Sequence, residues 1–206
     1  MTLNLYYCEQ LKFSYIISSF DEVSGSLRQL TKNSPLYEIS YDVHSGDSLF
    51  TGSRQRPQIY NDNGIVKALF FKCRDTDGLV MLSNITDGWE SICYYLSREC
   101  NIPVYMFHFD CTNSNDMYNG FSFLQDGNNT RTVYAMKDPK WIFFETGEQQ
   151  WFEKPELYTS RRIRDRMTKQ IITQYCKALD LRIENPEFWV PSGKSLLFTY
   201  TPPTEQ

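Results

Sequence analysis

The stretch Leu79–Phe109 (LVMLSNITDGWESICYYLSRECNIPVYMFHF) constrains the fold more than any other part of the chain. Two short apolar runs, Leu79–Leu82 and Val104–Phe109, bound this stretch, and each has the length and composition of a buried strand. Between them, apolar residues recur at helical spacing and form one stripe: Trp89, Ile92, Cys93, Leu96 and Cys100. A strand, a helix and a strand in this order predict a crossover unit with two parallel strands.

The ends of this helix also have sequence signals. Asp87 is a good N-cap candidate, because its carboxylate can accept hydrogen bonds from the free N–H groups of the first turn. Glu90 follows three residues later, where it can complete a capping box and oppose the helix dipole. Asn101-Ile102-Pro103 ends the pattern. These signals predict a helix over about residues 88–101.

A second long helix is predicted over residues 160–179. Its apolar residues recur every four positions, at Ile163, Met167, Ile171, Tyr175 and Leu179. A shorter helix is expected from Glu22 to Lys32, with Asp21 as its cap.

Alternating or β-branched segments predict the strands, and Asp75-Thr76-Asp77-Gly78 is the best hairpin turn. The remaining expected strands are Leu3–Cys8, Phe13–Ser19, Leu36–Val43, Ile65–Arg74, Phe121–Gln125, Thr130–Met136, Lys140–Glu145, Gln150–Glu153 and Ser195–Tyr200. The sequence therefore predicts one α+β domain over residues 1–206. We expect a mixed, mostly antiparallel sheet and two main helices, at about 88–101 and 160–179.

Charge and cysteine usage limit the classes of partner. The formal net charge of −4 makes a nucleic acid an unlikely partner and gives no support for binding an anionic membrane. The chain has no apolar run long enough to cross a bilayer. Its six cysteines form no C-x-x-C pair and follow no secretion signal, so we expect a cytoplasmic protein.

No residue pattern predicts a catalytic or metal site. The two histidines, His44 and His108, have no cysteines at zinc spacing, and neither lies near a nucleophile motif. The Asp75–Gly78 turn begins like a calcium loop but lacks the later oxygen ligands. We therefore expect no catalytic residue, no metal and no cofactor.

One candidate binding surface lies on the expected hairpin Trp141–Glu153. Acidic side chains surround an aromatic one there, a combination that suits a protein interface with a basic partner. An ordinary exposed hairpin remains the alternative. The predicted partner-binding residues are Glu145, Glu148, Trp151 and Glu153.

A basic cluster, Arg161–Lys169, is the other candidate surface. It has five basic residues and one acidic residue at the expected start of the second helix. It would suit a phosphate or nucleic-acid site, although basic residues are disfavoured at the positive end of a helix dipole. Two alternatives follow. One is a small hydrolase or transferase that combines this cluster with His44 or His108, and the other is an RNA-binding module.

Asp87-Gly88-Trp89 with the helix and strand after it, followed by Phe143–Arg166 (FFETGEQQWFEKPELYTSRRIRDR), resembles bacterial immunity proteins encoded beside secreted polymorphic toxins. The resemblance covers roughly residues 79–190 and concerns the layout more than any single motif. It implies a small cytoplasmic protein without an active site, which binds one cognate toxin domain and blocks it. The basic Arg161–Arg166 segment departs from the family's usual acidity. Membrane binding is not implied.

Overall fold

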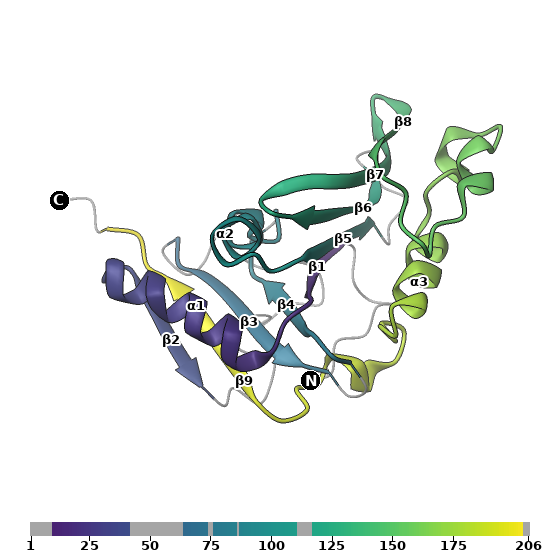
Figure 1. Cartoon of the computed structure of the whole chain (residues 1–206). Helices are drawn as coiled ribbons and strands as arrows, with labels where there is room; N and C mark the ends of the chain where they lie inside the picture. Colours follow the sequence, from purple (N-terminus) through teal and green to yellow (C-terminus); the bar gives the residue numbers. More distant parts are fainter. Residues whose placement is uncertain (1–9, 42–63, 74–75, 86, 111–116, 204–206) are drawn as a thin grey trace.

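The computed structural model describes residues 10–41, 64–73, 76–85, 87–110 and 117–203. Within them, nine strands form one open sheet in the order β2-β9-β3-β4-β1-β5-β6-β7-β8 (Figure 1). The strands are β1 (Gln10–Ile16), β2 (Tyr37–Tyr41), β3 (Val66–Lys72), β4 (Leu79–Ser83), β5 (Val104–Asp110), β6 (Tyr118–Gln125), β7 (Asn128–Asp138), β8 (Lys140–Gly147) and β9 (Ser195–Tyr200). The predicted α+β class is confirmed. The expectation of a mixed sheet is wrong, because every neighbouring pair is antiparallel.

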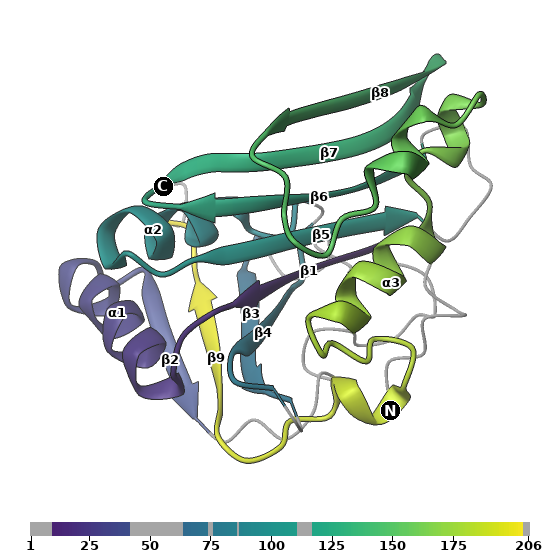
Figure 2. The same cartoon turned by 45° about the vertical axis from the view of Figure 1, so that its right-hand side comes forward.

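Helices cover both faces of the sheet. The helices α1 (Phe20–Asn33) and α2 (Glu90–Cys100) pack on one face, and α3 (Lys169–Ala178) packs on the other (Figure 2). Among the described residues, three 3-10 turns lie on the α3 side: η4 (Pro155–Thr159), η5 (Ile163–Asp165) and η6 (Pro186–Trp189). Each face has its own hydrophobic core. Strand β5 shows how alternation supplies both cores, because Tyr105 and Phe107 face α3 whereas Val104 faces α2.

The strands β4 and β5 run in the same direction, as the crossover prediction requires. However, they are not neighbours, because β1 lies between them and pairs antiparallel with both. All seven residues of β1 pair with β5, from Gln10 opposite Asp110 to Ile16 opposite Val104. Strand β1 therefore lies between the two strands of the predicted crossover unit.

The start of α2 differs from the prediction. Trp89 occupies the N-cap position in a left-handed conformation (φ 59°) and makes no side-chain cap hydrogen bond. Asp87 is not the cap. Its Oδ1 accepts the backbone N–H of Trp89 at 2.8 Å and closes a turn just before the helix. The helix therefore begins at Glu90, which rules out the predicted capping box.

The first half of the predicted helix 160–179 is also wrong. The helix α3 begins only at Lys169, where the Thr168 hydroxyl caps it by accepting the N–H of Ile171. This start keeps the basic residues Arg161–Arg166 outside the helix, away from the positive end of its dipole. At α1, Ser19 is the cap in place of the expected Asp21.

The expected return strand Gln150–Glu153 does not form. After β8 the chain turns at Gly147 (φ 83°), where a side chain would collide with the carbonyl group of Thr130. It then crosses the α3 face, and Phe152 packs against Tyr105 and Phe121. The expected strand Leu3–Cys8 lies outside the described residues. None of the helices in the described part of the chain combines the length and apolar character needed to cross a membrane.

Candidate functional site

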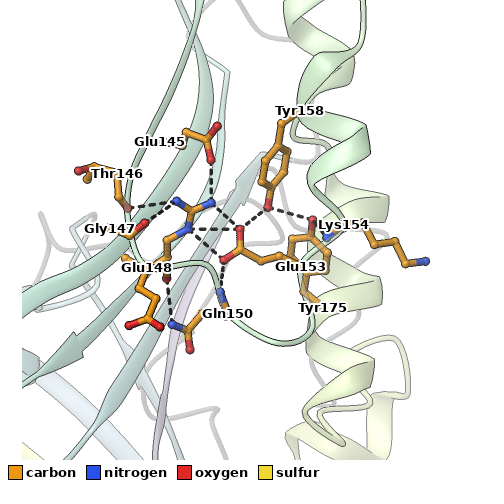
Figure 3. Close-up of polar contacts among 10 residues, drawn as sticks. Glu145, Thr146, Gly147, Glu148, Gln150, Glu153, Lys154, Tyr158 and Tyr175 are labelled. Atoms are coloured by element: carbon orange, nitrogen blue, oxygen red, sulfur yellow. Dashed lines mark hydrogen bonds and ion pairs between the residues drawn. The ribbon is translucent and has the colours of Figure 1, made fainter.

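Two of the four predicted partner-binding residues, Glu145 and Glu153, bind the guanidinium group of Arg131 on β7, and Figure 3 shows how the two carboxylates lie. Arg131 is only 4% exposed, and all three of its guanidinium nitrogens donate hydrogen bonds. Its Nη2 contacts Glu153 at 2.7 Å and Glu145 at 2.8 Å. Its Nη1 contacts the carbonyl groups of Thr146 at 3.3 Å and Gly147 at 3.1 Å. One buried cation thus binds the end of β8 and the segment that follows it.

Glu153 connects this arginine to α3. Besides Arg131, its carboxylate accepts the backbone N–H of Gln150 and the hydroxyl of Tyr158, both at 2.7 Å. The hydroxyl groups of Tyr158 and Tyr175 are 3.0 Å apart, and Tyr175 also accepts the backbone N–H of Lys154 at 3.1 Å. These polar groups fix the chain from residue 148 to residue 158 across the α3 face (Figure 3).

The ionisation of the cluster follows from these contacts. Burial alone would lower the pKa of Arg131, but its hydrogen bonds to Glu153 and Glu145 outweigh burial and raise that pKa. Burial, followed by hydrogen bonds to Tyr175 and Glu153, raises the pKa of the Tyr158 phenol. Arg131 therefore stays cationic and Tyr158 stays neutral near pH 7, as expected of a structural cluster.

The four predicted residues thus separate into two pairs. Glu153 is buried (8% exposed) and Glu145 forms an ion pair with Arg131, so both stabilise the fold. Glu148 is exposed, and Trp151 is 74% exposed. Sequence reasoning missed Arg131 because it sits in an ordinary alternating strand. The available signal was its register, since Arg131, Val133 and Ala135 alternate onto one core-facing side.

The basic cluster lies on the same face as α3. Arg161, Arg162 and Arg164 are exposed, whereas Arg166 donates to the carbonyl group of Ser160 at 2.9 Å and lies over the Phe143 ring. His108 is on the opposite face of the sheet, where its ring stacks on Tyr118. The structure therefore does not form the predicted pocket joining the arginines to His108. His44 lies outside the described residues.

A groove opens on the face that carries α1 and α2, in front of the first turn of α2. Its cavity volume is about 200 Å³. Strands β1, β5 and β6 form the floor, and the turn Asp87-Gly88 with Glu90 forms one wall. The titratable residues that line it are Lys12, Asp87, Glu90, His108 and Tyr118. No sequence motif revealed this groove, because its residues come from four separate elements.

The titratable groups of the groove are shifted mainly by burial. Burial and the nearby Lys12 lower the pKa of His108 to about 3, so its imidazole is neutral at pH 7. Burial lowers the pKa of Lys12 and raises the pKa of Glu90, and each of the two partly offsets the shift of the other. The Nε2 atom of His108 is buried and has no hydrogen-bond partner among the described residues.

Stacked rings continue from the groove towards the edge of the sheet. The ring centroids of His108 and Tyr118 are 4.5 Å apart, those of Tyr118 and Tyr134 are 5.2 Å apart, and those of Tyr134 and Phe144 are 5.3 Å apart. Gly120 permits this arrangement, because a Cβ there would lie 2.5 Å from the Cβ of Tyr134. We call these four rings the aromatic row.

Other reactive groups in the described part of the chain are buried or scattered. Burial raises the pKa of the Cys73 and Cys176 thiols, and it raises that of Cys93 to about 12. Among the described residues, no three His, Cys, Asp or Glu side chains gather where they could hold a metal ion. Comparisons with protein-family models, curated protein sequences and solved structures found no match.

Proposed function

We propose that this chain is a non-enzymatic cytoplasmic binding protein, an immunity protein that neutralises a cognate bacterial toxin domain by direct binding. The observation that carries this proposal is Trp151, a large apolar side chain that is 74% exposed on a firmly held loop. Tryptophan is among the residues most enriched at the energetic centres of protein interfaces.

The two neighbours of Trp151 in the chain are fixed. The Gln150 backbone N–H binds Glu153, and its side-chain oxygen accepts the Tyr105 hydroxyl at 2.7 Å. On the other side, Phe152 is buried against Tyr105 and Tyr175. A loop that is already ordered loses little conformational entropy when a partner binds, so more of the contact energy remains as affinity.

Charge around Trp151 favours a basic partner. Glu148 is exposed, and Glu145 keeps 45% of its side-chain surface exposed although it pairs with Arg131. The chain as a whole has a formal net charge of −4. An apolar contact with acidic residues beside it suits a toxin domain with a basic surface, because complementary charge steers association and excludes wrong partners.

The exposed arginines Arg161, Arg162 and Arg164 keep an RNA-binding module as an alternative. No contact given for the described arginines favours it over the proposed function. The salt dependence of the affinity distinguishes RNA binding from toxin binding, because RNA binding through these residues would weaken steeply as the salt concentration rises.

Co-expression with a toxin domain encoded beside the gene of this chain tests the proposal. The proposal predicts that the chain restores growth and that the two proteins elute together on size exclusion. The Trp151→Asp variant should lose both effects while keeping the far-ultraviolet circular dichroism of the parent, because this side chain is mostly in solvent.

The control is Phe144→Ser in the aromatic row, which changes a 44% exposed ring on the opposite face of the sheet. This variant should still rescue growth. Failure of the parent chain to rescue growth and to form a complex would contradict the proposed function.

A further inference from the structure

The groove in front of α2 lies on the face opposite the Trp151 loop, so its interpretation does not depend on the proposed partner. The turn that forms its wall packs against strand β1 of its floor. A Cβ at Gly88 would lie 3.2 Å from the Cβ of Lys12, so the turn before α2 packs directly on the lysine stem. The ammonium end of Lys12 therefore lies in a groove whose wall packs on the lysine stem, unlike that of a freely exposed surface lysine.

One buried polar atom of the groove lacks a partner in the described part of the chain. His108 Nε2 is buried and unsatisfied. Beside it, Lys12 is half-buried and Glu90 is exposed at the opening of the groove, and each partly offsets the pKa shift that burial causes in the other. A buried polar atom without a partner is uncommon in protein interiors, and one on a residue that lines a cavity, with two charged side chains in the same lining, indicates a ligand.

The charges in the groove determine which ligand fits. An anionic ligand would meet the carboxylates of Asp87 and Glu90, and a cationic ligand would meet the ammonium group of Lys12. Burying an unpaired charge beside a like charge is costly. A neutral group with an acceptor next to a donor satisfies both sides, because it can accept from Lys12 and donate to Glu90.

We propose that this groove binds a small planar aromatic compound carrying a neutral carboxamide or ring amide. The amide oxygen accepts from the Lys12 ammonium group, the amide N–H donates to Glu90, and the neutral imidazole of His108 supplies the remaining polar contact. Met106 and Tyr118 also line the groove and contact the apolar ring. A cavity of about 200 Å³ suits a one-ring or two-ring compound.

The test uses three probes that share one ring and differ in charge: benzamide, benzoate and benzylammonium. The chain has only two histidines, so imidazole NMR signals of the whole protein at pH 7 are simple, and a His108→Gln variant identifies those of His108. We expect benzamide to shift the His108 signals saturably, with the weak affinity of a fragment this small. Benzoate and benzylammonium should leave them unchanged.

The Lys12→Met variant should weaken benzamide binding about tenfold, as expected for the loss of one charged hydrogen bond. Its matched control, Lys140→Met, changes an exposed lysine at the far edge of the sheet and should bind normally. Thermal midpoints verify that both variants fold.

Four results would overturn the proposal. They are the absence of any shift with benzamide, stronger binding of either charged probe, unchanged binding in Lys12→Met, and equal binding of acetamide, which lacks the ring.

Discussion

The Arg131→Met substitution removes the cation from a cluster in which the Glu153 side chain has no exposed surface. Methionine retains apolar packing but leaves the carboxylate buried without its counter-charge. Removing one partner of a buried ion pair costs about 3–5 kcal/mol, because the remaining charge stays desolvated. This is a large part of the 5–15 kcal/mol or so by which a typical domain is stable. We expect the free energy of unfolding to fall by that amount at pH 7.

The same substitution predicts an unusual dependence on pH. When a proton binds the uncompensated Glu153 carboxylate, the buried charge disappears. The free energy of the folded state then falls more than that of the unfolded chain, where the carboxylate is hydrated. The stability deficit of Arg131→Met relative to the parent should therefore shrink as the pH is lowered from 7 towards 5. Urea unfolding, followed by far-ultraviolet circular dichroism and linear extrapolation, measures the deficit at each pH.

A double-mutant cycle with Glu153→Gln isolates the interaction. The Arg131→Met/Glu153→Gln variant contains no buried charge at these positions and should be more stable than Arg131→Met alone, by about 2 kcal/mol. A deficit below about 1 kcal/mol for Arg131→Met, or strict additivity in the cycle, would refute the structural role assigned to this pair.

Three further substitutions probe packing, capping and titration. Gly120→Ala should destabilise the fold by about 1–3 kcal/mol in urea unfolding, because its Cβ would lie 2.5 Å from the Cβ of Tyr134. The control Gly25→Ala lies within α1, where an added Cβ would meet no atom within 4 Å other than the helix backbone and the two chain neighbours, and it should stabilise by about 0.4–1 kcal/mol. Stabilisation by Gly120→Ala together with destabilisation by Gly25→Ala would contradict the described packing. Thr168→Ala removes the cap of α3 and should lower the free energy of unfolding by about 1 kcal/mol. The pKa of His108 is lowered from 6.5 to about 3, so the unfolded chain binds the extra proton and stability should fall as the pH drops through that window. A His108→Gln variant should lack that contribution.

Sequence reasoning succeeded where the signal is local. The closing strand Ser195–Tyr200 has the predicted bounds, and β3 pairs with β4 around the predicted turn. Four of the five residues in the predicted stripe are buried, with Ile92 and Leu96 in the core, and Cys100 is half-buried. These features depend on periodicity and turn residues within a few positions, which a sequence displays directly.

The errors arose where contacts are long-range. Nothing near β1 indicates that it pairs with both β4 and β5, which lie more than sixty residues further along the chain. Likewise, Glu153 reads as one more exposed acid until its partner Arg131, 22 residues earlier, is known to be buried. The groove in front of α2 was missed for the same reason.

The most direct test of the proposed function is the affinity of the cognate toxin domain for the parent chain and for Trp151→Ala, measured by titration calorimetry. The proposal predicts that Trp151→Ala loses about 2 kcal/mol or more, roughly thirtyfold in affinity, because Trp151 would be the centre of the interface. The control Phe144→Ala should bind like the parent. Equal affinity of Trp151→Ala and the parent, or a loss confined to Phe144→Ala, would contradict it.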